Sequence, residues 1–184
     1  MQADSGHAVF ETALGWIGIG WSANGITHLQ LPEKDRSATE ARLLARGASR
    51  ETGTPPLAIQ SVIDALIRYA SGEHVDFSQT PVDFAGVDEF RLSIYEQARQ
   101  LAYGTTTTYG GLCDAAGHPG LARETGEAMG SNPVPIIVPC HRVLAAGGKM
   151  GGFSAPGGVF TKRRLLDMEH AKPPSPPGQS AFDF

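Results

Sequence analysis

In this 184-residue chain, potentially reactive side chains are most concentrated in the tetrapeptide Pro139-Cys140-His141-Arg142. A cysteine becomes a strong nucleophile as its thiolate, and a neighbouring imidazole can act as the base that removes the proton. The apolar run 134–138 just before it disfavours a charged thiolate, so a reactive Cys140 needs a base or a cation close by. On an extended segment, adjacent side chains point to opposite faces, so Cys140 and His141 need a bend or a bridging water to share a proton. Pro139 fixes φ and favours such a bend.

A structural interpretation of the same residues stays open at this point. Cys140 can equally be a small buried hydrophobic residue and His141 a surface residue. The second cysteine, Cys113, falls inside an expected helix and is assigned to packing. Two cysteines without a Cys-x-x-Cys pair form neither a disulfide framework nor a zinc cluster. The remaining histidines are scattered, so the sequence predicts no metal site and no cofactor; they are His7, His28, His74, His118 and His170.

Composition places the chain among folded proteins, with 41% hydrophobic and 18% charged residues. It contains 23 Gly and 13 Pro without a period, which indicates many turns and excludes collagen and coiled coil. No stretch is long and apolar enough to span a membrane, and the N-terminus lacks signal-peptide character, so we expect a cytoplasmic protein with no membrane partner. The net charge is −4, and residues 1–85 carry six Lys and Arg against ten Asp and Glu. Residues 86–171 carry eight against eight, so only this second part is expected to meet DNA.

The first 85 residues are expected to form a small α/β domain. β-rich stretches around an Ala-Asn-Gly turn predict a hairpin or meander over 8–31. Apolar residues at helical spacing predict helices over 38–46 and 57–71. The Pro-containing stretch 75–84 is typical of an edge strand or a connector, and the domain boundary is expected near 80–88.

The second domain, residues 86–171, is expected to be mainly helical. A helix from Asp88 towards Tyr103-Gly104 is followed by a threonine run that caps a short helix over 109–116. A turn at 118–120 leads into a helix over 121–129, which gives the spacing of a helix-turn-helix. Further on, the pattern predicts a buried strand at 134–138, a wing-like loop at 145–158, a helix at 159–170 and a disordered tail at 172–184.

Residues 132–143, NPVPIIVPCHRV, closely resemble the active-site signature of the O6-alkylguanine-DNA alkyltransferases, also called methylated-DNA–protein-cysteine methyltransferases. The resemblance extends from about Phe90 to His170. Its other matching motifs are Tyr103-Gly104 with Tyr109-Gly110, Ala122-Arg123, Phe153-Ser154 with Gly157-Gly158, and residues 162–166 followed by Glu169. It implies an α+β protein with a ribonuclease-H-like N-terminal domain and a winged helix-turn-helix C-terminal domain.

The resemblance also implies an activity. The family repairs DNA by moving an alkyl group from O6 of guanine onto its own cysteine, irreversibly and once per molecule. Cys140 matches that acceptor, and His141 matches the histidine that activates it through a water and meets a carboxylate matched by Glu169. Tyr109 matches the residue that protonates the departing guanine, and Asn132 matches the asparagine that fixes the elbow before the nucleophile.

The implied partner is double-stranded DNA containing O6-alkylguanine, bound through its minor groove by a monomer. The target nucleotide must be flipped out of the stack, and Arg123 matches the finger that replaces it. The resemblance assigns substrate contacts to Val143, Ser154 and Pro135. It assigns further DNA contacts to Ala122, Gly126 and Thr108.

The chain departs from the family pattern at three places. Ala155-Pro156 is an apparent insertion in the wing, and Gly130 stands where a basic residue is common. Glu124 and Glu127 place carboxylates on the helix expected to face DNA, where Glu127 can pair with Arg123. Two rival functions remain: a non-enzymatic sensor of alkylated guanine, against which the presence of Cys140 argues, and a cysteine hydrolase.

Overall fold

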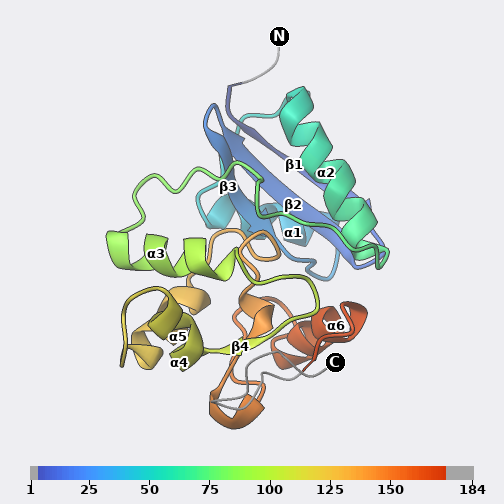
Figure 1. Cartoon of the computed structure of the whole chain (residues 1–184). Coiled ribbons are helices and arrows are strands. Elements are labelled where there is room, and N and C mark those ends of the chain that lie inside the picture. Colours follow the sequence, from blue (N-terminus) through green and yellow to red (C-terminus); the bar gives the residue numbers. More distant parts are fainter. Residues whose placement is uncertain (1–3, 173–184) are drawn as a thin grey trace. The chain divides into compact units, whose positions relative to one another are not determined.

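The computed structural model describes residues 4–172, which form two compact units (Figure 1). Unit 1 holds the described residues up to Asp88 together with the segment Asn132–Val138, and unit 2 holds Glu89–Ser131 and the residues from Pro139 onward. The chain therefore passes between the units three times. The segment Asn132–Val138, which the sequence placed inside the second domain, groups with unit 1. The predicted disordered tail, apart from Lys172, lies outside the described residues.

Unit 1 is built on an antiparallel sheet of three strands in the order β1-β2-β3. These are β1 (Gly6–Thr12), β2 (Gly15–Ser22) and β3 (Gly25–Gln30). The strands expected over 8–31 are thus confirmed as a meander. Gly25 has a φ of 140°, and a Cβ there would lie 2.6 Å from the carbonyl oxygen of Pro81, so the β2–β3 turn requires glycine.

Two helices, α1 (Arg36–Ala45) and α2 (Leu57–Ala70), pack on opposite faces of this sheet (Figure 1). Both confirm the helices expected from apolar spacing. Gly18 and Gly20 of β2 lie under α1 and the residues after it, where a Cβ on Gly18 would come within 3.0 Å of the Leu43 side chain. The opposite face of β2 carries fully buried Ile17 and Ile19, which belong to the apolar core.

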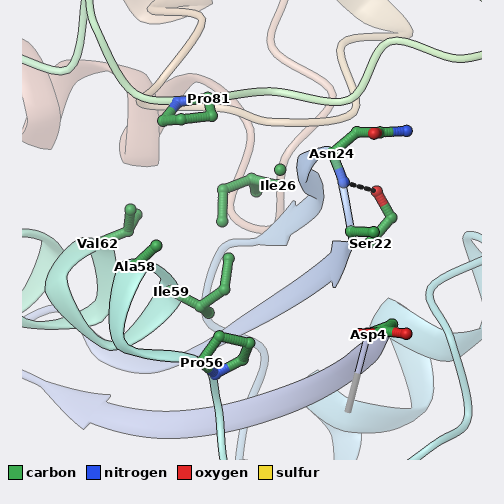
Figure 2. Close-up of a pocket in the computed structure, with 11 residues that line it drawn as sticks. Asp4, Ser22, Asn24, Ile26, Pro56, Ala58, Ile59, Val62 and Pro81 are labelled. Atoms are coloured by element: carbon green, nitrogen blue, oxygen red, sulfur yellow. Dashed lines mark hydrogen bonds between the residues drawn. The ribbon is translucent and has the colours of Figure 1, made fainter. Parts of the chain in front are cut away.

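The stretch 75–84 is a connector. Its only pairing in the described chain is a single bridge between Val82 and Ile26. Pro81 has no N–H to donate to a ladder, which stops a regular edge strand from forming there. A pocket of about 450 Å³ lies beside it, with apolar walls from Ile26, Ile59 and Val62 and a polar rim that includes Ser22 and Asn24 (Figure 2).

Unit 2 contains the other four α-helices of the described chain, and each lies where the sequence predicted one. They are α3 (Glu89–Ala98), α4 (Tyr109–Ala115), α5 (Ala122–Gly130) and α6 (Val159–Met168). Thr108 caps α4, because its hydroxyl accepts a hydrogen bond of 3.0 Å from the Gly111 N–H. The Tyr95 hydroxyl on α3 donates to the Ala128 carbonyl on α5 at 2.8 Å, which joins these two helices.

The predicted strand at 134–138 is wrong. The segment is instead a tight turn, in which Val138 N donates to Val134 O at 2.9 Å. Pro135 lies inside it and Pro139 follows it, and neither can donate to a strand ladder, so an apolar run that resembles a buried strand cannot join a sheet. The turn also contains Ile136 at a φ of 73°, a left-handed conformation that is an outlier for a β-branched residue.

After this turn the chain forms a short 3-10 helix, η1 (Cys140–Arg142), and then β5 (Val143–Leu144). β5 pairs in parallel with β4 (Thr107–Thr108), so that Thr107 lies opposite Val143. Among the described residues, the expected wing loop contains a second 3-10 turn, η2 (Ala146–Gly148), and no strand.

Candidate active site

Cys140 is the first residue of η1, and its side chain is nearly buried, with 7% of the residue exposed. In a 3-10 helix, consecutive side chains are about 120° apart, not on opposite faces as in a strand. The bend that Cys140 and His141 need is therefore supplied by the backbone itself. His141 is fully buried, so its interpretation as a surface residue is wrong.

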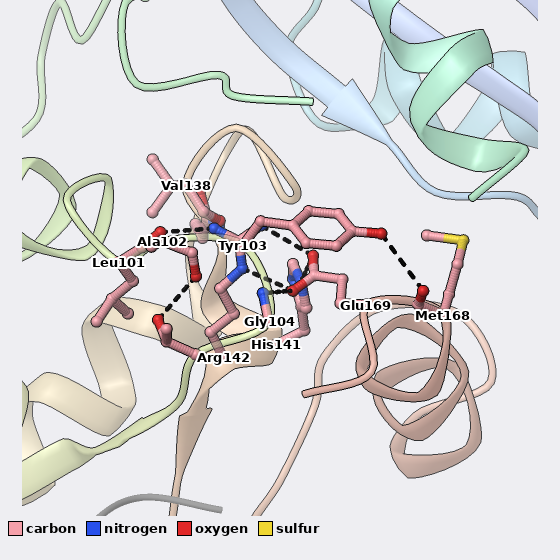
Figure 3. Close-up of polar contacts among 11 residues, drawn as sticks. Leu101, Ala102, Tyr103, Gly104, Val138, His141, Arg142, Met168 and Glu169 are labelled. Carbon is pink, nitrogen blue, oxygen red and sulfur yellow. Dashed lines mark hydrogen bonds and ion pairs between the residues drawn. The ribbon is translucent and has the colours of Figure 1, made fainter. Parts of the chain in front are cut away.

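His141 is held by Glu169, which directly follows α6. The distance from His141 Nε2 to Glu169 Oε1 is 2.7 Å, and both side chains are fully buried (Figure 3). Because a carboxylate can only accept, the proton lies on Nε2 and leaves Nδ1 as the basic nitrogen. Burial lowers the pKa of His141, and Glu169 partly opposes that shift. The ring is therefore neutral at neutral pH and able to take up a proton.

Arg142 makes a forked ion pair with the same carboxylate. Its Nε and Nη2 atoms each lie 2.9 Å from a Glu169 oxygen, and its Nη1 donates to the Leu101 carbonyl at 2.7 Å (Figure 3). Burial alone raises the pKa of Glu169, but hydrogen bonds and charge from His141 and Arg142 hold that pKa well below its usual range. The carboxylate therefore stays ionised. Glu169 and both of its side-chain partners are buried.

Gly104 completes the surroundings of Glu169. Its N–H donates to Glu169 Oε2 at 3.2 Å, and its φ is 73°. A Cβ at this position would lie 2.9 Å from the Glu169 backbone carbonyl, so only glycine fits. The Tyr103-Gly104 motif thus supports the carboxylate that orients His141.

Tyr109 and Lys162 reach the same site from two helices. The pairing of β4 with β5 sets Tyr109, the first residue of α4, beside the strand that follows the nucleophile. Lys162 on α6 is fully buried, and its ammonium donates to Val143 O at 2.7 Å and to Gly152 O at 3.3 Å. The ammonium also lies 5.8 Å from the centre of the Tyr109 ring.

Burial governs the ionisation of both groups. It lowers the pKa of Lys162 to about 8, against an opposing contribution from Cys140. It raises the pKa of Tyr109, and the Cys140 charge adds to that rise, so the phenol holds its proton. Sequence reasoning assigned no role to Lys162. Lys162 and Glu169 are seven residues apart, which places them on one face of a helix and could have linked them.

A cavity of about 480 Å³ opens over Cys140 within unit 2. Ser154 is part of its wall, and its hydroxyl donates to the Gly130 carbonyl at 2.9 Å. The cavity is lined by Tyr109, Gly126, Met129, Gly130, Cys140, Gly152, Phe153 and Ser154. The structure therefore brings together Cys140, Tyr109, Ser154 and Gly126 of the expected site, and Val143 joins them through Lys162.

Of the remaining residues expected to meet DNA, Arg123 and Ala122 lie on the exposed face of α5, and Thr108 lies before α4. Arg123 has a side chain that is 88% exposed, and its Nε lies 3.4 Å from Glu127 Oε1, so the predicted pair is confirmed. Ala122 and Glu124 are exposed beside it. Thr108 is occupied in capping α4.

Asn132 and Pro135 lie in the turn that belongs to unit 1. The Asn132 amide donates to Val138 O at 2.8 Å and its side-chain oxygen accepts from Val134 N at 3.0 Å, so one side chain closes the turn. The left-handed Ile136 inside the turn costs roughly 1–3 kcal/mol, which these bonds must offset.

No group of three or more His, Cys, Asp or Glu side chains in the described residues could hold a metal ion. No helix between residues 4 and 172 is long and apolar enough to cross a membrane. Cys113 is buried in α4, where its thiol donates to the Gly110 carbonyl at 3.2 Å, in keeping with packing.

The site defines a class of protein in which a nearly buried cysteine, backed by an imidazole and an ionised carboxylate, lines an open cavity. Residues 89–171 match the family model for the DNA-binding domain of 6-O-methylguanine DNA methyltransferase. The methylated-DNA–protein-cysteine methyltransferase of Mycobacterium tuberculosis is 41% identical over 128 residues, which are 69% of this chain and 75% of that protein. The corresponding protein of Methanothermobacter thermautotrophicus is 32% identical over 155 residues, 83% of this chain and 78% of that protein.

Solved structures agree with these sequence matches. A crystal structure of Mycobacterium tuberculosis OGT in complex with DNA superposes with a TM-score of 0.71 at 31% identity, covering 92% of this chain and 95% of that one. The O6-methylguanine-DNA methyltransferase of Pyrococcus kodakaraensis gives 0.69 at 28% identity, covering 89% and 99%. The chain belongs to the methylated-DNA–protein-cysteine methyltransferase family.

Proposed function

We propose that this protein repairs DNA by transferring an alkyl group from O6 of guanine directly and irreversibly to Cys140. The observation that carries this proposal is the connected set Cys140, His141 and Glu169, with Cys140 lining a cavity of about 480 Å³. The family to which the chain belongs supports the reaction and the DNA substrate.

The thiolate forms through His141. A water beside Cys140 takes the thiol proton and passes one to Nδ1 of the neutral imidazole, whose Nε2–H already points to Glu169. The imidazolium that results lies against an ionised carboxylate, which stabilises its charge. Arg142 keeps that carboxylate ionised and in place.

Transfer is a single in-line displacement. The thiolate forms a bond to the alkyl carbon while the bond from that carbon to O6 breaks, and its electron pair stays on the guanine. Tyr109 gives its hydroxyl proton to the departing base, and the buried ammonium of Lys162 near its ring favours the negative charge left on the phenolate. The thioether has no route back to a thiol, so each molecule acts once.

The DNA contacts are assigned to α4 and α5 as a helix-turn-helix, with the following loop as its wing. Because the target atom is inside the duplex, the nucleotide must leave the stack, and exposed Arg123 fills the space from the minor-groove side. Ala122 and Thr108 contact the backbone, Gly126 lets it approach, and Ser154 with Val143 and Pro135 contacts the flipped base. A ribonuclease-H-like unit 1, a monomeric state and a cytoplasmic location complete the proposal.

The decisive experiment mixes the protein with one equivalent of duplex containing O6-methylguanine and measures its intact mass. Wild type should gain one methyl group, mapped to Cys140. Cys140→Ser should gain nothing yet still bind the duplex, because a hydroxyl of nearly the same volume cannot supply the attacking anion. The matched control, Cys113→Ser, should react as wild type does.

Other outcomes identify the rival functions. Binding by wild type without a mass gain would mean that the protein is a sensor. Several products per protein molecule would mean hydrolytic turnover, and a methyl group mapped to Cys113 would overturn the assignment of the nucleophile.

A further inference from the structure

Unit 1 supplies no reacting group to the chemistry above, yet it includes the turn that leads to the nucleophile. Two consecutive carbonyls at the start of the turn are bound by unit 1: Pro133 O accepts from Leu29 N at 2.9 Å, and Asn132 O accepts from Arg46 Nη2 at 3.0 Å. Leu29 lies in β3, and Arg46 follows α1 directly. The turn is therefore tied to both layers of unit 1.

The Arg46 side chain connects β3 to the turn through hydrogen bonds to both. While Nη2 reaches Asn132, Nη1 donates to Leu29 O at 2.8 Å and to Gln30 Oε1 at 3.0 Å. Its own backbone N–H is fixed by the last carbonyls of α1, including those of Arg42 and Leu43. A planar guanidinium can serve three acceptors at once in a fixed geometry, which a lysine ammonium on a flexible stem does not reproduce.

The turn needs such support. Ile136 has a φ of 73°, and a β-branched residue keeps a left-handed conformation only when its surroundings over-determine it. Inside the turn, the Asn132 side chain bonds to Val138 O and Val134 N. Outside it, Arg46 and Leu29 bind the backbone of Asn132 and Pro133. Cys140 follows Val138 by only two residues, so a relaxed turn would displace the thiol.

We propose that Arg46 is a positioning residue for Cys140, and that unit 1 serves the reaction by holding the strained Asn132–Val138 turn through it. Arg46 touches neither the substrate nor the reacting atoms. It acts through the Asn132 carbonyl. The inference rests on the proposed function insofar as Cys140 is the alkyl acceptor.

The test compares Arg46→Met, Arg46→Lys and, as a matched control one helical turn earlier, Arg42→Met, all in a Cys113→Ser background. Arg42 is exposed in the last turn of α1. Four quantities are measured: the rate of Cys140 alkylation by iodoacetamide, the saturating rate of methyl transfer from duplex, the duplex Kd and the melting temperature. In Arg46→Met, both rates should fall about 10- to 100-fold with the Kd unchanged, because a small misplacement of a reacting group costs rate, not binding. Arg46→Lys should recover part of the rate, and Arg42→Met should match wild type.

Unchanged rates in folded Arg46→Met, with only a lower melting temperature, would overturn the proposal, since Arg46 would then merely support the fold. If Arg46→Met does not fold, Arg46→Lys decides: a rate equal to that of wild type overturns the proposal, and a reduced rate at unchanged Kd supports it. The iodoacetamide rate needs no DNA. If wild type fails to transfer methyl but its thiol reactivity depends on Arg46, the proposed function fails and the positioning role stands.

Discussion

Glu169 is the most heavily engaged side chain of the site, because it accepts from His141, Arg142 and the backbone of Gly104. In Glu169→Gln the neutral amide cannot stabilise an imidazolium, and Arg142 is left as a buried charge without its carboxylate. We expect the methyl-transfer rate to fall by up to the ~10²–10⁴ that a positioned general base contributes. The free energy of unfolding should fall by about 3–5 kcal/mol. Single-turnover transfer and urea unfolding measure the two effects.

Asp167→Asn is the matched control, since Asp167 is exposed near the end of α6, two residues before Glu169, and its substitution should change neither quantity. The pH dependence of stability in acid provides a second test of the Glu169 ion pair. The folded pKa of Glu169 lies below its unfolded value of about 4.3, so its stabilisation is complete above that pH and is lost as the pH falls towards the folded pKa. The stability difference between wild type and Glu169→Gln should therefore shrink in acid; a difference that stays constant with pH would contradict the ionised pairing.

Lys162 should make the free energy of unfolding depend on pH in the alkaline range. Burial lowers its pKa from 10.5 to about 8, so between these values the unfolded chain binds more protons than the folded one. The free energy of unfolding should therefore rise with pH across this window, by about 3 kcal/mol at most. Lys162→Met should abolish this rise, whereas Lys149→Met, in an exposed loop, should keep it. Urea unfolding at several pH values provides the measurement, and an equal rise in both variants would refute the assignment.

At the scale of elements, α5 carries an acidic feature unusual for a surface proposed to meet phosphates. Glu124 is exposed next to Arg123, and a carboxylate near the DNA backbone is repelled. Glu124→Ala should tighten duplex binding by about 2- to 5-fold, and more at low salt than at high, because screening weakens the repulsion. Duplex affinity across a salt series tests this.

Substitutions of two other carboxylates serve as comparisons in the duplex-affinity measurement. Glu127→Ala frees Arg123 from its ion pair, so it should speed base flipping more than it changes affinity. Asp64→Ala, exposed on α2 of unit 1, should leave affinity unchanged. Weaker or equal affinity for Glu124→Ala would show that α5 does not dock on DNA as proposed.

The elements differ in how well the sequence predicts them. All six α-helices of the described residues, and the first sheet, follow from apolar spacing and turn residues, which are local properties. The turn Asn132–Val138 did not follow, because its apolar run resembles a buried strand while two prolines and the Asn132 side chain dictate another path.

The residues of the site also differ in whether the sequence predicts them. Cys140, His141, Glu169 and Tyr109 were found through motif resemblance, and the pair between Arg123 and Glu127 through helical spacing. Arg46 and Lys162 were not found, because their partners are backbone carbonyls, which leave no signature in side-chain type. A residue that acts on the backbone of a distant segment can be recognised only after the chain has folded.

At the scale of the whole molecule, the three passages of the chain between the units make a prediction about fragments. Residues 89–184 alone would carry the Asn132–Val138 turn without Leu29 and Arg46, which hold its backbone. The turn contributes four buried aliphatic side chains: Val134, Ile136, Ile137 and Val138. We expect the fragment to bind a hydrophobic dye, to aggregate and to transfer methyl groups slowly. A monodisperse fragment with the wild-type rate would show that the turn holds its own shape.

The same interleaving bears on how such a protein can change by descent. Recombination at residue 88 would combine the Asn132–Val138 turn of one parent with the Leu29 and Arg46 contacts of another. The parts of the gene before and after residue 88 therefore cannot be exchanged freely between relatives. A substitution at Arg46 should instead be inherited together with compensating ones near Asn132. The surface residues of unit 1 can then vary widely in sequence, while the few positions that bind the turn change only together with the turn itself.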